Sequence, residues 1–497
     1  MERIKQIKKA RIGLYSVGLK AYWTQFEGLE QRLINYGKFI EKKLSQFGEV
    51  YNFGLVDDEI KGREAGEWLN SNNVDFVFCH SATYCTSSSV LPVHQICNSP
   101  LVILNLQPTA SMNYEKTSTG EWLAHCGACP VPEFANALNR AGVDYKIING
   151  LLGLEETPEI SITDEVTVNR KEAIRAWREI SEWAQAATVK RTLQNSRFGF
   201  LGNNYSGMLD MYSDFTMVQS QMGIHVEILE MCDLDKNLKS ITEEEINAKM
   251  ASVKEFFQIS GDSPSDPIAK KPSEEQLKWS CKVAVAQEKM IKEYDLDALS
   301  YYYHGSNGNH YEDLQSGFIV GHSLLTAAGI PCAGEGDLKT AIAMKICDIV
   351  EKGGSFSEIV AVDYNEETII LGHDGPFHIS ISEGVPVLRG MGVYHGKKGS
   401  GVSVEAKVKE GEVTTLGITQ TIDGKMKMII SEGKAIKAPI LMIGNTQTHI
   451  KFKEHPDKYM DKWFVEAPTH HCAMSVGHNA SLFEKIAYLL NLNKIIL

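Results

Sequence analysis

The sequence lacks the features that would place the chain in a membrane or on a nucleic acid. None of its apolar runs approaches the roughly 18–20 residues that a membrane-spanning helix needs. The net charge is −13 and no Lys/Arg-rich tract stands out, so we expect neither nucleic acid nor an anionic membrane as a partner. The basic N-terminus leads into a short strand without an apolar core and cleavage site, so we expect no secretion signal.

Cysteine is also sparse, with ten residues scattered mostly singly among 497, which fits reduced thiols in the cytoplasm. One close pair, Cys126 and Cys129, can be half a zinc site or a redox pair, but no second C-x-x-C completes a zinc site and a structural role is our preferred interpretation. The HExxH, EF-hand, GxSxG and kinase motifs are all missing. Gly202–Gly207 lacks the P-loop lysine and a full GxGxxG, which argues against nucleotide binding.

The length predicts about three domains. Residues 10–150 alternate apolar strands with amphipathic helices, which predicts a doubly wound α/β domain over residues 1–180 with ligand-facing loops at the carboxyl ends of its strands. After a long helical segment the alternation restarts at Arg197–Leu201, which predicts a second α/β domain over residues 181–354.

Beyond residue 355 the hydrophobic period falls to two, which predicts an antiparallel β domain over residues 355–497 that a final helix, Ser481–Leu490, closes. The predicted strands of this domain include Val402–Val408, Val413–Thr421, Met426–Ser431 and Pro439–Ile443. The expected fold class is therefore α/β, with two doubly wound parallel-sheet domains followed by a C-terminal antiparallel β domain.

The stretch from Gly334 to His378 gathers the side chains with the clearest chemistry. Asp337 has the position of a helix N-cap, the helix after it should end at Gly353-Gly354, and Glu335 precedes the cap. Two strands around an Asn365-Glu366 turn would place Glu358 opposite His373 if Tyr364 faces Glu367, although a one-residue slip would send them to opposite faces.

These groups admit two interpretations. The carboxylates before the helix can simply satisfy its free N–H groups, and Glu358 with His373 can be an exposed cross-strand pair. Two carboxylates joined by two imidazoles can instead hold a divalent cation, and His470-His471 offers a distant source of the last ligand. A mixed O/N set suits Mn²⁺, Co²⁺, Mg²⁺ or Zn²⁺, and the lack of a thiolate argues against structural zinc.

With these residues in place, the chain resembles the L-arabinose isomerase family, within the wider group of L-arabinose and L-fucose isomerases. Glu335-Gly-Asp-Leu-Lys-Thr-Ala341 is similar to the family's EGD-x-K-T-A. Ser355-Phe-Ser-Glu358, Leu371-Gly-His373 and His470-His471 are similar to three further family motifs in the same order. The first loop, Lys20–Gln25, and the Asp-Gly-Pro after His373 depart from the best-known members, which leaves the preferred sugar open.

The resemblance implies an aldose–ketose isomerase, L-arabinose to L-ribulose or a close relative, that assembles as a homotrimer or homohexamer. It implies a Mn²⁺-like ion, Co²⁺ and Mg²⁺ being alternatives, on Glu335, Glu358, His373 and one late histidine, for which we favour His471. Glu335 and Glu358 would also be the acid/base groups. The candidate substrate-binding residues are Gln25, Tyr22, Met208 and His470. A sugar-binding or regulatory protein, and a metal-dependent aldolase or dehydratase acting on a sugar acid, stay as alternatives.

Overall fold

The computed structural model describes residues 2–497 except 157–164, 262–265, 306–307, 392, 395–396 and 399–400. The chain divides into two compact units. Lys8–Arg191 forms one, and Met1–Ile7 together with Thr192–Leu497 forms the other, so the first is inserted near the start of the second. The boundaries of the three domains expected above stay predictions. Among the described residues, no helix is long and apolar enough to cross a membrane.

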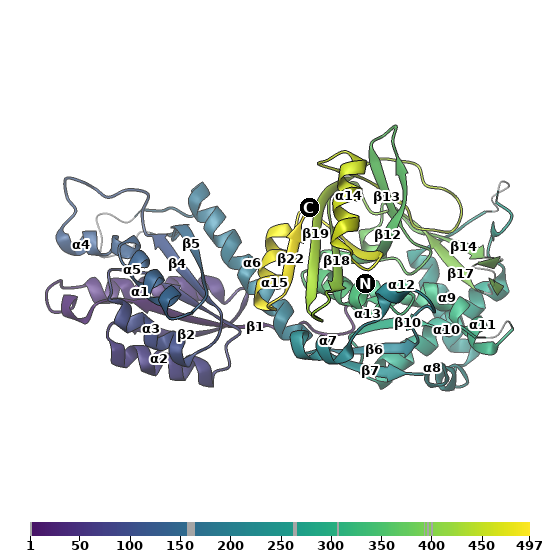
Figure 1. The fold of residues 1–497 in the computed structure, drawn as a ribbon, viewed down its shortest axis with the longest axis horizontal. Coiled ribbons are helices and arrows are strands. Elements are labelled where there is room, and N and C mark those ends of the chain that lie inside the picture. Colours follow the sequence, from purple (N-terminus) through teal and green to yellow (C-terminus); the bar gives the residue numbers. More distant parts are fainter. Residues whose placement is uncertain are drawn as a thin grey trace. The chain divides into compact units, whose positions relative to one another are not determined.

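The Lys8–Arg191 unit is built on a parallel five-stranded sheet in the order β2-β1-β3-β4-β5 (Figure 1). Its strands are β1 (Ala10–Val17), β2 (Gly48–Val56), β3 (Phe76–His80), β4 (Leu101–Gln107) and β5 (Tyr145–Leu151). Its helices are α1 (Leu29–Leu44), α2 (Glu59–Ser71), α3 (Ser87–Ile96), α4 (Thr119–Leu123), α5 (Val131–Arg140) and α6 (Lys171–Leu193), whose last two residues pass into the other unit. The order reverses between β1 and β3, and this doubly wound arrangement confirms the expected α/β fold.

A buried carboxylate joins the two ends of this unit. Asp75, just before β3, accepts a hydrogen bond from the Arg11 backbone N–H at 2.7 Å and pairs with the Arg191 guanidinium at 3.0 Å. Arg11 lies near the point where the chain enters the unit, and Arg191 is its last residue. The entering and leaving segments therefore meet at one side chain.

The larger unit contains a second parallel sheet and a closed antiparallel sheet. The parallel sheet has the order β11-β10-β6-β7, from β6 (Arg197–Gly202), β7 (His225–Leu229), β10 (Ala298–Tyr302) and β11 (Cys332–Ala333). The main helices around it are α7 (Phe215–Met222), α8 (Met231–Leu238), α9 (Glu243–Phe256), α10 (Glu274–Glu293), α11 (His310–Ser316) and α12 (Phe318–Ala327). The second α/β segment and the antiparallel segment thus occur in the predicted order.

The antiparallel sheet runs β18-β21-β12-β13-β20-β19 and closes because β18 also pairs with β19, while β22 adds in parallel beside β19. Its strands are β12 (Gly353–Asp363), β13 (Thr368–Gly372), β18 (Gly411–Gln420), β19 (Met426–Ala435), β20 (Thr448–Phe452), β21 (His471–Val476) and β22 (Asn493–Ile496). A smaller sheet contains β8 (Gln258–Ile259), β9 (Ala269–Lys270), β14 (Val387–Met391) and β17 (Val402–Glu405). Helices α14 (Pro456–Glu466) and α15 (Ala480–Leu489) complete the unit.

Two expectations for this region are wrong. Pro439–Ile443 forms no strand, because Pro439 cannot donate a ladder hydrogen bond and the side chains of Leu441 and Met442 point to solvent. The final helix also does not close the chain, because β22 follows it and extends the sheet. A strand of only four residues shows too little periodicity to be recognised.

Helix α13 (Leu338–Ile349) lies between the parallel sheet and the closed sheet, and all twelve of its residues are buried. Burial on every side requires partners for its charged groups. Lys345 donates to the Gly329 carbonyl at 2.7 Å, and Asp348 receives a bidentate contact from Arg3, with nitrogen–oxygen distances of 2.9 and 2.7 Å. The Arg3 contact holds the N-terminal segment on this unit.

The predicted end of this helix is wrong by four residues. The helix ends at Ile349, and Glu351 takes the left-handed conformation (φ 59°) that usually marks a glycine after a helix. Gly353 and Gly354 begin β12 instead. The glycine signal was misleading because a non-glycine residue occupies the turn.

Candidate metal centre

The turn before α13 positions the first carboxylate. Asp337 caps the helix, as predicted, by accepting from the Thr340 N–H at 2.9 Å. Glu335 has φ 59° and Gly336 has φ 78°, so two successive residues are left-handed. A Cβ on Gly336 would come within 2.5 Å of the Asn203 carbonyl oxygen. The EGD sequence therefore makes a tight, strained turn that projects Glu335 away from the helix.

The predicted pairing of Glu358 with His373 is wrong in register. Asp363 faces Thr368 as the tight turn requires, but Val360 forms a bulge and shifts the ladder by one residue. Glu358 consequently faces Gly372 on β13 and, on its other side, His471 on β21. Directly opposed residues share a face, so Glu358 and His471 project together.

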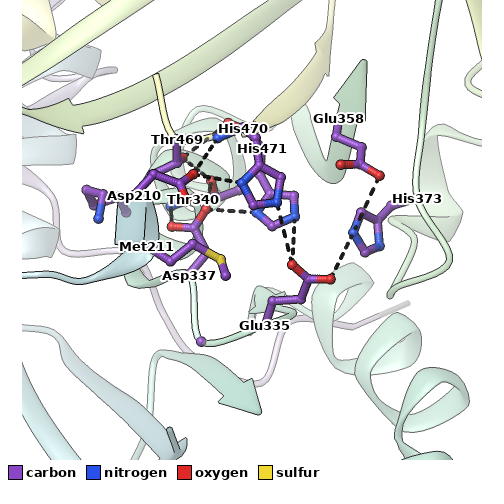
Figure 2. A network of polar contacts seen from close by, with 12 residues as sticks. Asp210, Met211, Glu335, Asp337, Thr340, Glu358, His373, Thr469, His470 and His471 are labelled. Atoms are coloured by element: carbon purple, nitrogen blue, oxygen red, sulfur yellow. Dashed lines mark hydrogen bonds and ion pairs between the residues drawn. The ribbon is translucent and has the colours of Figure 1, made fainter. Parts of the chain in front are cut away.

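His373 nevertheless reaches Glu358, because it lies just beyond the last residue of β13. Its backbone exchanges hydrogen bonds with Thr446, and its Nδ1 lies 2.7 Å from the Asp374 carboxylate. The Gly375 backbone N–H also donates to this Nδ1 at 2.9 Å, and Nε2 faces the two glutamates, 3.8 Å from Glu335 and 4.0 Å from Glu358 (Figure 2). A regular hairpin would have placed His373 directly opposite Glu358, whereas with the bulge His373 reaches Glu358 from the turn after β13.

His471 is fully buried as the first residue of β21. Its Nδ1 lies 3.0 Å from Asp337 Oδ2, and its Nε2 lies 3.5 Å from Glu335 Oε2. The helix cap thus also orients this imidazole, as carboxylates commonly do for metal-binding histidines. Phe356 packs against His471 and His373, with ring centroids 4.3 and 4.7 Å apart, and restricts both rings.

His470 points into the same cluster from the loop before β21. Its Nε2 lies 3.5 Å from Glu335 Oε2, and its ring packs at a tilt of 41° against His471 with centroids 3.9 Å apart. Asp210 accepts from both the His470 backbone N–H, at 3.1 Å, and its Nδ1, at 2.7 Å. Asp210 was not foreseen from the sequence, because 260 residues separate it from its partner and no motif surrounds it.

The histidines and carboxylates strongly affect one another's protonation. Burial raises the pKa of Glu335, but its contact with His470 and the charges of His471 and His373 outweigh burial, so its pKa is lowered. Burial lowers the pKa of His470, but Glu335 and Asp210 raise it to about 9. Burial lowers the pKa of His471, and the Asp337 contact only partly opposes this. At neutral pH the cluster therefore contains an ionised carboxylate, Glu335, beside a neutral imidazole, His471, and a protonated one, His470.

These residues fit a divalent cation. Two groups have ligand atoms that all lie within 4.8 Å of one another: Glu335, His470 and His471, and Glu358, His373 and His471. Ligand atoms around an ion at about 2.1 Å are themselves about 3–4 Å apart, which matches the separations above. Among the described residues, Glu335 Oε2 and His471 Nε2 are buried without a hydrogen-bond partner. Such uncompensated atoms are expected of metal ligands.

Comparison with known proteins links this centre to a family. The model of the L-arabinose isomerase central domain matches residues 201–353. An L-arabinose isomerase from Nocardioides sp. is 22% identical over 369 residues, 71% of this chain and 66% of that protein. An L-arabinose isomerase 2 from Bacillus licheniformis is 22% identical over 351 residues, 67% of this chain and 70% of that protein. These matches support the L-arabinose isomerase family for this chain. The resemblance seen in the sequence motifs is thereby confirmed at family level.

The family match covers only part of the centre. Glu335 lies inside the matched central domain, whereas Glu358, His373 and His471 follow its end. A third relative, an L-arabinose isomerase from Saccharophagus degradans, is 26% identical over 213 residues, 41% of this chain and 39% of that protein. The chain spans about two thirds of the length of the first two relatives.

The four candidate substrate-binding residues lie in both units. Met208 directly precedes the short 3-10 helix η3 (Leu209–Met211), in the same unit as His470. Tyr22 and Gln25 belong to the Lys8–Arg191 unit, where Tyr22 packs edge-on against Phe26 and the Gln25 amide donates to the Ala21 carbonyl. All four assignments stay predictions.

Proposed function

We propose that this member of the L-arabinose isomerase family is a metal-dependent aldose–ketose isomerase that acts on a free sugar, L-arabinose or a close relative. The supporting observation is the convergence of Glu335, Glu358, His373 and His471 from four separate segments. A mere sugar-binding protein does not need two carboxylates and buried unpartnered ligand atoms at one point.

In this proposal Glu335, Glu358, His373 and His471 hold Mn²⁺, or Co²⁺ or Mg²⁺ in its place. The choice of His471 over His470 is supported by its membership of both candidate ligand groups and by its complete burial. Asp337 fixes a proton on the outer nitrogen of His471, so that its inner nitrogen can donate a lone pair, while Asp374 and the Gly375 N–H hold the outer nitrogen of His373 in place. The bound cation would hold two neighbouring sugar oxygens and polarise the carbonyl bond.

The two glutamates would perform the proton transfers. Converting an aldose to a ketose removes a proton from C2 and adds one at C1, while the O2 hydroxyl proton passes to O1. One carboxylate takes the C2 proton as a general base and returns it to C1, and the other moves the proton between O2 and O1. Glu335 is ionised and can therefore accept a proton, because the histidines around it lower its pKa despite its burial; the same shift makes it a weaker base.

The same proposal assigns Gln25, Tyr22, Met208 and His470 to sugar contacts. It also includes a cytoplasmic homotrimer or homohexamer in which the first domain covers a neighbour's active site. These assignments rest on the family and, for the cytoplasm, on ten thiols that are all free in this chain.

Product analysis tests the proposal. The metal-stripped protein is incubated with a panel of aldoses, with and without Mn²⁺, and the products are identified by chromatography and NMR. We expect Mn²⁺-dependent ketose formation, highest with L-arabinose or a close relative, and its loss in EDTA. Sugar binding without turnover would indicate a binding protein, and cleavage or dehydration of sugar acids would indicate the aldolase or dehydratase class; either result overturns the proposal.

A further inference from the structure

Asp210 is placed against His470 by a rigid local scaffold. It is the middle residue of η3, and the Asn204 amide bridges the Met211 carbonyl, at 3.2 Å, to the Gly336 carbonyl, at 2.7 Å. That single side chain links the backbone beside Asp210 to the turn that carries Glu335. The position of Asp210 relative to Glu335 is therefore fixed through the main chain.

A buried lysine adds a second anchor to the same segment. Lys339 of α13 donates to the Tyr212 carbonyl and to the Ser213 hydroxyl, both at 3.0 Å. Burying an ammonium group is costly, so its use to hold two residues of a loop indicates that this loop must be held in place. The backbone N–H of Asp214, at the end of the loop, donates to Gln420 Oε1 at 3.0 Å and so connects the loop to β18.

The contact itself determines how the imidazole is presented. One oxygen of Asp210 accepts from the His470 backbone N–H and from the ring Nδ1. An ionised carboxylate only accepts, so the ring must carry a proton on Nδ1, and Nε2 is directed toward Glu335. Figure 2 shows Asp210 behind His470, with Glu335 on the ring's opposite edge. Without this partner, an imidazole that is one-third exposed can rotate and exchange tautomers.

We propose that Asp210 is a positioning residue, which fixes the orientation and tautomer of His470 so that His470 Nε2 faces Glu335 and a hydroxyl group of the bound sugar. The role in turnover rests on the proposed isomerase function; the role in orienting His470 does not. Asp210 acts through His470 and touches no reacting atom.

A double-mutant cycle tests the role in turnover. We expect Asp210→Ala to lower kcat/KM about 10–100-fold, and Asp210→Asn less, because the amide oxygen still accepts from Nδ1. In the His470→Ala background, Asp210→Ala should change kcat/KM less than about twofold, because there is no ring left to position. Equal losses in both backgrounds would mean that Asp210 only stabilises the loop, and would overturn the proposal. Asp214→Ala is the matched control: it removes a helix cap on the same segment but no contact to His470, and should retain turnover.

NMR tests the orientation without any activity. The protein is labelled with ¹³C-histidine and measured both metal-free and loaded with Mg²⁺. The signal that disappears in His470→Gln is assigned to His470, and its Cδ2 chemical shift reports which ring nitrogen carries the proton. Because Glu335 and Asp210 raise the pKa of His470 to about 9, the tautomer is read above that pH, where we expect a proton on Nδ1 in the wild type and a tautomer mixture in Asp210→Ala. An unchanged His470 signal in Asp210→Ala would overturn the positioning role. If the wild type makes no ketose but shows the expected signals, the isomerase function is rejected and the positioning role of Asp210 is retained.

Discussion

Asp337 both caps α13 and orients the His471 ring, and the substitution Asp337→Asn separates these two roles. Asp337 accepts from the Thr340 N–H at 2.9 Å, the Thr340 hydroxyl at 2.8 Å and His471 Nδ1 at 3.0 Å. Asparagine caps helices about as well as aspartate, and its oxygen can keep the bond to the Thr340 N–H. Its NH₂ group then faces His471, which must accept through Nδ1 and carry its proton on Nε2. That proton occupies the lone pair that the cation needs.

The magnitudes follow from these contacts. A lost orienting partner lowers metal affinity about 10–100-fold, which corresponds to about 1.4–2.8 kcal/mol of binding free energy. The folding free energy should change by only about 1 kcal/mol, because each buried group still finds a partner. Asp337→Ala instead removes the cap and leaves Thr340 and His471 unpaired in the core, at a cost of about 3–5 kcal/mol.

Calorimetric titration with Mn²⁺ and thermal denaturation of the metal-free variants provide the measurements. We expect Asp337→Asn to bind Mn²⁺ weakly while melting near the wild-type temperature, and Asp337→Ala to melt several degrees lower. If Asp337→Asn binds Mn²⁺ as tightly as the wild type, then the tautomer of His471 does not depend on Asp337, or His471 is not a ligand.

Three further predictions concern the proposed chemistry and its scaffold. Glu335→Gln or Glu358→Gln should lower kcat by at least about 100-fold with an unchanged circular dichroism spectrum, and near-wild-type rates in both would eliminate the acid/base roles. Mn²⁺ at about 100 times its dissociation constant should stabilise the wild type by about 2.7 kcal/mol in thermal denaturation; an equal gain in His471→Ala would exclude His471 as a ligand. Gly336→Ala should lower the free energy of unfolding in chemical denaturation by more than about 2 kcal/mol, because the new Cβ meets the Asn203 carbonyl. Gly207 is also left-handed but has no neighbour within 4 Å, so Gly207→Ala should lower it by less. Equal losses in the two variants would refute the steric argument.

Local signals predicted the parts of the centre that depend on neighbouring residues. The cap at Asp337 and the turn at Glu335 follow from sequence positions within one helical turn, and the structure contains both. The parallel and antiparallel segments were recognised in the same way, because buried strands and period-two strands differ in composition over a few residues.

The remaining parts depend on events that leave little trace in a single sequence. A bulge at Val360 shifts the ladder of β12, yet valine suits any regular strand. The neighbour that Glu358 gains on β21 lies more than a hundred residues along the chain, so only the folded sheet reveals it. Asp210 was concealed for the same reason, because 260 residues separate it from His470. Long-range pairing, rather than local propensity, determines which side chains surround the candidate cation.

The buried carboxylate of Asp75 has a consequence for how such a protein can diversify. Because Arg11 and Arg191 meet there, the intervening segment leaves and rejoins the chain at neighbouring points, as transplantable modules do. Recombination at those two points would exchange everything between them, Tyr22 and Gln25 included, without interrupting any strand that carries Glu358 or His471. The topology thus allows this unit, with its proposed sugar-binding residues, to be exchanged separately from the proposed metal ligands.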